Sequence, residues 1–180
     1  IGKTQFSLKM RGYHARNHRI HLADQNDEII IKVQDQNITL KMCNIYKHLG
    51  IKTAADLSMS AEINSKTKWY KDRIGSSLRT MIGDQSIKLD YRKNILTSLL
   101  ISGILHGSST WSKLTKQEES NVYHTIMKAY RLLLPSKYSK YNMEKISDTQ
   151  VLTVVNLPTP QNLLRIQKLS ILNRLIIGKH

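Results

Sequence analysis

The sequence is poor in several residue types, and each scarcity excludes a class of protein. Its 180 residues include one cysteine, one phenylalanine, three prolines and 13 acidic residues. The single cysteine, Cys43, excludes an internal disulfide and a zinc site built from cysteines. It fits a reducing compartment or burial as a small apolar residue, of which we favour burial. No apolar run approaches the roughly 18 residues of a membrane span.

Motifs of known active sites are also missing. The sequence contains no G-x-S-x-G, no Walker loop, no H-E-x-x-H and no pair of adjacent aspartates. The spacing of His14, His18 and His21 suits one helical face, but no complete ligand set is visible, so we predict that they bind no metal. A hydrolase or metal enzyme would require these histidines to converge with a carboxylate. We therefore predict no catalytic residue and no metal ligand within the chain.

Positive charge is present in excess. The chain has 28 Lys and Arg against 13 Asp and Glu, a net charge of +15. This excess is far beyond what solubility requires and predicts a polyanionic partner, with nucleic acid as the leading candidate. A membrane surface is the rival partner. Because the basic residues are spread over several segments instead of one amphipathic helix, we expect no membrane partner.

The hydrophobic period changes between residues 50 and 59. Glu28–Val33 and Asn37–Met42 are rich in β-branched residues and flank a polar turn, so they predict a β-hairpin. We expect a strand at Tyr46–Ile51 to pack beside it. From Met59 onward apolar residues recur at helical spacing almost to the end. The predicted fold class is α+β, with a small N-terminal antiparallel β-hairpin or sheet followed by a mainly α-helical bundle of about five helices.

Two of the expected helices are defined by their apolar stripes. The first spans Met59–Ile82, and its stripe steps by three or four residues through Ile63, Thr67, Tyr70, Ile74, Leu78 and Met81. Basic residues occupy the flanks and back of this helix, among them Lys66, Lys68, Arg73 and Arg79. The second helix begins at Asp90, and its expected buried side consists of Ile95, Leu96, Leu99, Leu100 and Ile104.

The other three helices carry start signals. Thr115 and Glu118 have the spacing of a capping box, which opens a helix whose apolar positions are Val122, Ile126, Ala129, Tyr130 and Leu133. A short helix is expected at Asp148–Asn156, and Pro160 suits the first turn of a last helix that ends near Ile177. The apolar side of that helix should dock on the bundle through Leu164, Leu169, Leu172 and Ile176. Trp111 is expected to be a packing anchor.

Three segments resemble reverse transcriptases of non-LTR retrotransposons. The sequence IYKHLGI that begins at Ile45, followed by ADLS, is similar to the family's "fxYLGv…dls" signature downstream of its catalytic center. Ile104 to Trp111, ILHGSSTW, resembles its "llYGsetW", and Lys3-Thr4 resembles the end of its "lNpxKT". The order of the three matches agrees with the family. His48 and His106 stand where the family usually has tyrosine, and Ser109 stands where it has glutamate.

The resemblance implies a role and a division of the chain. Residues 1–57 would be the end of the palm with a primer-grip-like hairpin, residues 58–135 a helical thumb, and residues 136–180 a helical extension. The implied partners are the template–primer duplex and the upstream fingers and palm of the same polypeptide. The implied nucleic-acid contacts are Lys3, Lys47, His48, Gly50, Lys66, Lys68, Arg73 and Arg79.

The catalytic aspartates, and the Mg²⁺ expected for the parent polymerase, would belong to sequence upstream. Because the chain begins with Ile1 and shows no signal segment, we expect it to be a piece of a longer polypeptide. Its site of action would be intracellular, and nuclear if the parent element is active. The alternative is a free-standing basic helical module that binds nucleic acid or protein.

Overall fold

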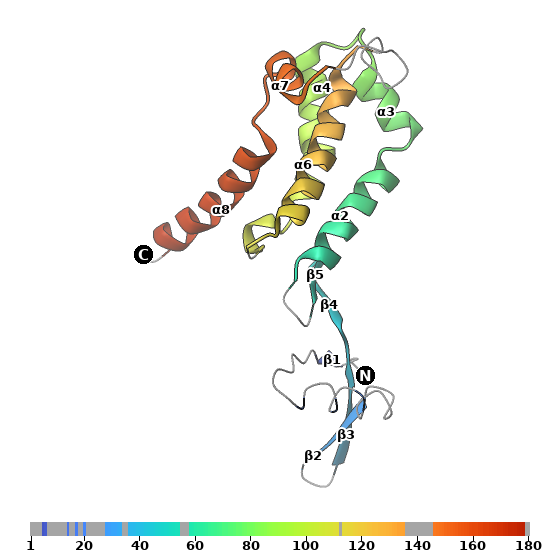
Figure 1. Ribbon diagram of the computed structural model, residues 1–180, viewed down its shortest axis with the longest axis vertical. Helices are drawn as coiled ribbons and strands as arrows, with labels where there is room; N and C mark the ends of the chain where they lie inside the picture. Colours follow the sequence, from blue (N-terminus) through green and yellow to red (C-terminus); the bar gives the residue numbers. More distant parts are fainter. Residues whose placement is uncertain are drawn as a thin grey trace. The chain divides into compact units, whose positions relative to one another are not determined.

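The computed structural model has its strands in the first part of the chain and its helices in the second (Figure 1). It describes residues 5–6, 14, 17, 20, 28–33, 36–54, 58–111, 113–135 and 146–178. The chain divides into two compact units, residues 1–62 and 63–180. The predicted α+β class, with small sheets followed by helices, is confirmed. The finer predicted division at residue 135 stays a prediction.

The first sheet is built on the predicted hairpin. Strands β2 (Glu28–Val33) and β3 (Gln36–Met42) pair antiparallel, from Glu28 opposite Lys41 to Val33 opposite Gln36. A two-residue strand, β1 (Gln5–Phe6), adds to the other side of β3 in parallel. Several of the isoleucines that make these strands are exposed, at 66% for Ile30, 42% for Ile31 and 43% for Ile38. The hairpin therefore presents apolar surface on both faces.

A second hairpin replaces the single strand expected at Tyr46–Ile51. Strands β4 (Ile45–His48) and β5 (Ile51–Ala54) pair antiparallel in a separate two-stranded sheet, so the predicted strand beside the first hairpin is wrong. The chain reverses at Leu49 and Gly50, whose φ angles are 47° and 82°. Two consecutive left-handed residues make the tight turn that suits a twisted hairpin. Cys43, which precedes β4, is half-buried instead of buried.

The helix predicted over Met59–Ile82 is two helices, α2 (Ser60–Arg73) and α3 (Ser76–Gly83). The Ile74 amide still donates to the Tyr70 carbonyl, but Gly75 has an extended backbone with ψ 171° and interrupts the helix. The interruption resets the helical phase. Ile82 is therefore fully buried and Met81 is 37% exposed, which reverses the end of the predicted stripe.

The second predicted helix contains a π-helical turn. It consists of α4 (Leu89–Leu96), the π-turn η1 (Thr97–Ile101) and α5 (Ser102–Leu105). A π-turn widens the helix and rotates the residues that follow. Leu96, Leu100 and Ile104 are buried as predicted, but Leu99 is 53% exposed and Ile101 takes a place in the core. The expected burial of Leu99 was wrong for this reason.

The remaining helices follow the predicted start signals. Helix α6 (Lys116–Tyr130) opens with the predicted capping box, in which the Glu118 amide donates to Thr115 Oγ1 and the Thr115 amide donates to Glu118 Oε2. A 3-10 turn, η3 (Arg131–Leu133), follows it, and another, η2 (Ser108–Thr110), precedes Trp111. Helices α7 (Asp148–Val155) and α8 (Pro160–Ile177) have nearly the predicted bounds. Trp111 is 4% exposed, which confirms it as a packing residue.

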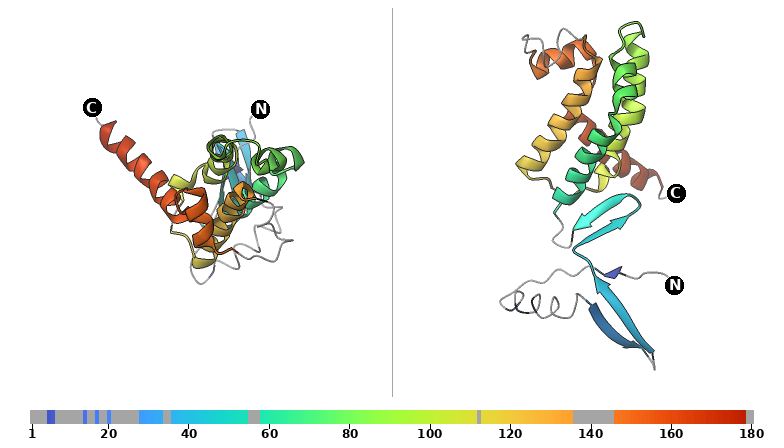
Figure 2. Two further views of the ribbon diagram at one scale, coloured as in Figure 1. Left: turned by 90° about the horizontal axis from the view of Figure 1, so that it is seen from above. Right: turned by 90° about the vertical axis from the view of Figure 1, so that its right-hand side faces the viewer.

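The last helix docks on the bundle only near its N-terminal end. Pro160 is buried and Leu164 half-buried, and α8 contacts η2 and α6. Leu169, Leu172 and Ile176 are 62%, 52% and 70% exposed, so the prediction that they pack on the bundle is wrong. The helix continues past α6, as the left view of Figure 2 shows. These apolar residues follow the helical period, but in the described part of the chain no neighbouring element buries them.

Gly103 allows α5 to pack closely against α2. A Cβ atom built on Gly103 would overlap the Trp69 ring. We expect Gly103→Ala to lower the free energy of unfolding by about 1 to 3 kcal/mol, because the rigid indole must move or leave its packing position. Urea denaturation followed by circular dichroism measures this. Gly75→Ala is the matched control, since nothing lies within 4 Å of the added methyl group, and it should change stability by less than about 0.5 kcal/mol. Equal effects of the two substitutions would contradict this packing.

Candidate nucleic-acid interface

Most of the excess positive charge belongs to the helical unit. Residues 63–180 contain 19 Lys and Arg against 7 Asp and Glu, a net charge of +12, whereas residues 1–62 contain 9 against 6, a net charge of +3. Sequence-independent affinity for nucleic acid comes from such cations when they are exposed. The helical unit therefore carries four fifths of the net charge.

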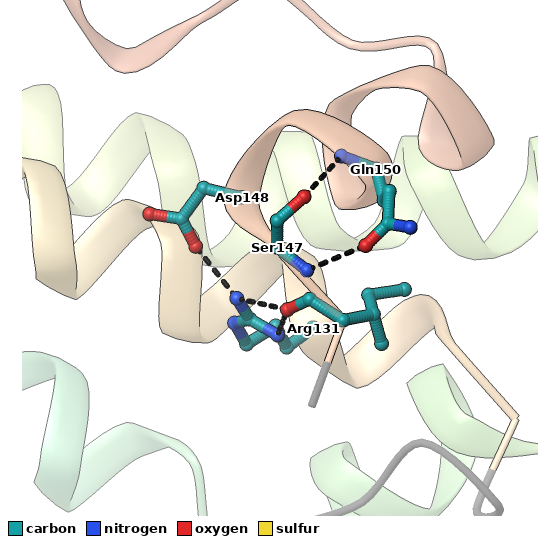
Figure 3. A network of polar contacts seen from close by, with 5 residues as sticks. Arg131, Ser147, Asp148 and Gln150 are labelled. Atoms are coloured by element: carbon teal, nitrogen blue, oxygen red, sulfur yellow. Dashed lines mark hydrogen bonds and ion pairs between the residues drawn. The ribbon is translucent and has the colours of Figure 1, made fainter. Parts of the chain in front are cut away.

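Some of these cations have structural partners. Arg131 donates to the Asp148 carboxylate at 2.6 Å and to the Ile146 carbonyl at 3.0 Å, which joins the end of α6 to the start of α7 (Figure 3). Beside this contact, Ser147 and Gln150 form a capping box for α7. Lys93 pairs with Asp90 at 3.5 Å within α4. Arg131 therefore connects two helices, whereas the Lys93 pair lies within a single helix.

Arg92 is a buried cation that sequence reasoning missed. It is 4% exposed, and its guanidinium donates to the carbonyls of Ile82, Ile87 and Leu133 at 3.0 to 3.2 Å. It also donates to Gln85 Oε1 at 3.3 Å. Ile82 and Leu133 lie at the ends of α3 and η3, where carbonyl groups lack helical partners and carry partial negative charge. Arg92 therefore closes two helix ends at once, and its charge is not available to a ligand.

The predicted contact residues on α2 and α3 do not form one row. Lys68, Arg73 and Arg79 are exposed, whereas Lys66 is half-buried. At about 100° per residue, Lys68 lies on the solvent side of α2, opposite the buried Ile63 and Tyr70. Lys66 lies at the border of the buried side. The exposed cations among the predicted contact residues of α2 and α3 are therefore Lys68, Arg73 and Arg79, which we call the α2–α3 cations.

One of the α2–α3 cations, Arg73, lies over an aromatic ring. The Arg73 guanidinium lies 5.9 Å from the centre of the Trp69 ring, in cation–π range. Trp69 is in turn fixed by its packing at Gly103. Burial raises the pKa of Tyr70 to about 12, and the charge of Arg79 partly opposes this shift, which places Arg79 near the Tyr70 hydroxyl. The charge of Arg73 is thus presented beside a packed aromatic ring.

The β4–β5 hairpin holds the other predicted contacts. Lys47 is exposed and lies directly opposite Lys52, so two like charges face each other across the strands. Such a pair destabilises a hairpin unless an anion bridges it. Gly50 is at the tip with positive φ, and His48 pairs with Ile51 through the backbone of β4. The side chain of His48, and all of Lys3, lie outside the described residues.

Glu62 connects this hairpin to the start of α2. Its carboxylate is fully buried and accepts the Lys52 amide at 2.7 Å. An acidic side chain in the first helical turn also interacts favourably with the helix dipole. Strand β5 is therefore bonded to the first turn of α2 through the Lys52 amide.

Four further basic residues that sequence reasoning missed line a cavity beside Trp111. They are Lys113, Lys116, Arg165 and Lys168. They come from the segment before α6, the first turn of α6 and the first half of α8, so that only the tertiary fold brings them together. No spacing signal in the sequence connects residues 113 and 168.

Two of the three histidines that we predict to bind no metal lie outside the described residues. His14 is exposed, and His18 and His21 are not described, so the predicted absence of a metal at these three residues stays a prediction. In the described ranges no three His, Cys, Asp or Glu side chains gather closely enough to hold a metal ion. None of the helices in these ranges combines the length and hydropathy needed to cross a membrane.

Comparison with protein-family models, with curated proteins and with solved structures finds no match for this chain. The functional assignment therefore depends on the residues and their geometry, together with the resemblance of the three sequence segments.

Proposed function

We propose that this chain is the downstream part of a non-LTR retrotransposon-type reverse transcriptase and that it holds the template–primer duplex. The β4–β5 hairpin positions the primer end as a primer grip. Helices α2 and α3 contact the duplex backbone as a thumb, without reading its sequence. The catalytic aspartates and their Mg²⁺ belong to the palm upstream, and the chain alone does not polymerise.

The observation that carries this proposal is the exposed charge of the helical unit. Its net charge is +12, and the α2–α3 cations are exposed beside helices that are fixed in the core by Ile63, Tyr70 and Ile82. Cations on a rigid scaffold contact phosphates at a low cost in conformational entropy. This arrangement suits a surface that binds any duplex sequence equally.

Two features of the backbone support the resemblance. The HLG of the first matching segment forms the tip of a tight hairpin, where Gly50 has φ 82°. In the second segment Gly107 has φ 79° and lies two residues after the last residue of α5, Leu105. Both glycines of the matching segments therefore occupy left-handed positions that favour glycine. The backbone conformation at Gly50 and Gly107 thus gives a physical reason for glycine at two positions on which the resemblance depends.

The exposed isoleucines of β2 and β3 support a larger parent protein. Ile30 and Ile31 are adjacent in the strand, point to opposite faces, and are both exposed. Large apolar residues on both faces of a hairpin are usually covered by a partner. The upstream palm is the partner that the proposal supplies.

The alternative is a free-standing basic module that binds duplexes but has no primer grip. The two functions differ in their response to a recessed 3′ end. As a primer grip, the hairpin should favour an RNA–DNA hybrid with a recessed 3′ end over a blunt hybrid of the same length by roughly tenfold at 0.1 M salt, the contribution of about one phosphate contact. A module without a grip should show no preference that depends on the hairpin residues.

The Lys47→Gln, Lys52→Gln double variant tests the hairpin. It should abolish the preference for the recessed end and leave binding to the blunt hybrid unchanged, as measured by fluorescence anisotropy. Because the change removes like-charge repulsion, the hairpin should remain folded. Lys32→Gln, Lys41→Gln on the first hairpin removes the same charge from two exposed positions and should keep the preference. A wild-type chain without any preference would sink the primer-grip assignment.

A further inference from the structure

A cavity of about 590 Å³ lies beside Trp111, between the starts of α6 and α8. We call it the Trp111 cavity. Its volume is in the range of roughly 300 to 1,000 Å³ that is usual for small-molecule pockets. At the other end of α6, its last residue, Tyr130, bonds the helix to the segment before α8, because the buried hydroxyl donates to the Pro158 carbonyl at 2.9 Å. The walls of the cavity therefore belong to ordered, packed elements.

The rim of the Trp111 cavity is strongly positive. Lys113, Lys116, Arg165 and Lys168 line it and are all exposed, against one acidic lining residue among those described, Glu119. The first residues of two helices, Lys116 of α6 and Pro160 of α8, also lie in the lining. Helix starts add partial positive charge to that of the side chains. The rim favours a ligand with negative charge.

The rest of the lining is apolar and aromatic. Trp111 and Pro160 are buried, and Leu114, Tyr123 and Leu164 are half-buried. The Trp111 indole nitrogen is buried and has no hydrogen-bond acceptor among the described residues, which is unusual for a packed tryptophan. An apolar lining beside cations does not suit a simple inorganic anion, which would leave the apolar part empty.

The ring of Tyr123 contacts the ring of the neighbouring His124. The His124 ring packs against it edge to face, with ring centres 5.7 Å apart. Burial raises the pKa of the Tyr123 hydroxyl, and the neighbouring Asp148 carboxylate raises it further. Tyr123 is therefore neutral at physiological pH and presents an ordered aromatic surface to the cavity.

We propose that the Trp111 cavity binds an unpaired nucleotide of a single-stranded nucleic acid. The base packs among Tyr123, Leu114 and Leu164, and the phosphates on either side face the rim cations. Stacking on an aromatic ring combined with backbone cations is the common mode of single-strand binding. A base edge also offers acceptors of the kind that the Trp111 indole lacks within the described part of the chain. This site is separate from the α2–α3 cations and does not depend on the reverse transcriptase assignment.

The test compares two triple variants of the whole chain. Lys113→Gln, Arg165→Gln, Lys168→Gln removes three of the four rim cations. Lys88→Gln, Lys128→Gln, Arg174→Gln removes the same charge from exposed positions outside the rim. The probe is a fluorescein-labelled oligothymidylate of about ten nucleotides, within the usual site size. The rim variant should flatten the slope of log affinity against log salt by about 2, at roughly 0.7 per phosphate. The control variant should leave the slope nearly unchanged.

Two variants of Tyr123 separate stacking from charge. Tyr123→Leu should weaken oligothymidylate binding about tenfold or more, whereas Tyr123→Phe keeps the ring and should bind like the wild type. Binding of a labelled polyglutamate peptide of equal charge should be insensitive to both Tyr123 substitutions. The proposal is overturned if the two triple variants behave alike, or if a folded Tyr123→Leu binds the oligonucleotide normally. It is also overturned if polyglutamate shows the same loss, because the cavity would then be a peptide site. If Tyr123→Leu does not fold, the two triple variants decide.

Discussion

Replacing Arg92 with leucine should lower the free energy of unfolding by about 3 to 5 kcal/mol. The guanidinium donates to three backbone carbonyls, those of Ile82, Ile87 and Leu133. Leucine leaves these acceptors without this donor, and each unsatisfied buried acceptor costs about 1 to 3 kcal/mol. Burial of the apolar leucine side chain offsets only part of this cost. Since most domains have a total stability of about 5 to 15 kcal/mol, the expected loss is a large fraction of the total stability.

Two controls identify the cause. Arg92→Lys keeps the charge but replaces a planar fork of donors with a single ammonium group. Its free energy of unfolding should therefore lie between those of the leucine variant and the wild type. Lys93→Leu changes the neighbouring residue, whose ion pair with the exposed Asp90 should contribute less than about 1 kcal/mol. Urea unfolding monitored by circular dichroism measures all three. A loss of less than about 1 kcal/mol for Arg92→Leu would contradict the view that this residue joins α3, α4 and η3.

The elements that could be predicted are those with local signals. The β2–β3 hairpin follows from β-branched residues around a polar turn, and its strands have nearly the predicted bounds. Helix α6 has its capping box at Thr115 and Glu118, and α8 begins at Pro160. At each helix start a few neighbouring residues satisfy the free backbone groups, so sequence neighbours carry the information.

The two long helices were predicted incorrectly because their helical phase shifts within an apparently continuous stripe of apolar residues. One extended residue, Gly75, divides the first long helix, and a π-turn at Thr97–Ile101 rotates the second. A stripe read at constant period cannot show either event, so Met81 and Leu99 were expected in the core and are exposed. The second hairpin was missed because Leu49, an unusual residue for a left-handed turn position, hides the reversal before Gly50.

The candidate site was predictable in its charge but not in its geometry. Composition predicted a polyanionic partner, and Lys68, Arg73 and Arg79 are exposed as expected. The half-burial of Lys66 depends on which side of α2 the bundle covers. The rim of the Trp111 cavity joins Lys113 to Lys168 across the fold, which no local pattern encodes.

Neutralising the α2–α3 cations should have the largest effect on binding. The variant Lys68→Gln, Arg73→Gln, Arg79→Gln should weaken affinity for a hybrid duplex by roughly two to three orders of magnitude at 0.1 M salt, if each residue contacts one phosphate. The loss should be the same for every duplex sequence, because phosphates carry no sequence information. The fold should survive, since all three side chains are exposed.

Two controls show how much of the loss in duplex affinity is specific to the α2–α3 cations. They are Lys66→Gln and the control triple variant. Lys66 is half-buried at the border of the core side, so Lys66→Gln alone should alter duplex affinity little. Lys88→Gln, Lys128→Gln, Arg174→Gln removes the same net charge from exposed positions elsewhere in the helical unit, and it reports the effect of lowering overall charge. Circular dichroism checks that helicity is retained in each variant.

The central claim, that α2 and α3 bind the backbone of a template–primer duplex, is tested most directly by the salt dependence of that binding. Fluorescence anisotropy on a hybrid duplex over a range of salt gives the slope of log affinity against log salt for the wild type and the α2–α3 variant. We predict that the slope becomes shallower by about 2.7, at roughly 0.9 per phosphate for three contacts. An unchanged slope with intact helicity, or an equal change in the control triple variant, would contradict the claim and leave these cations as a solvated helix surface.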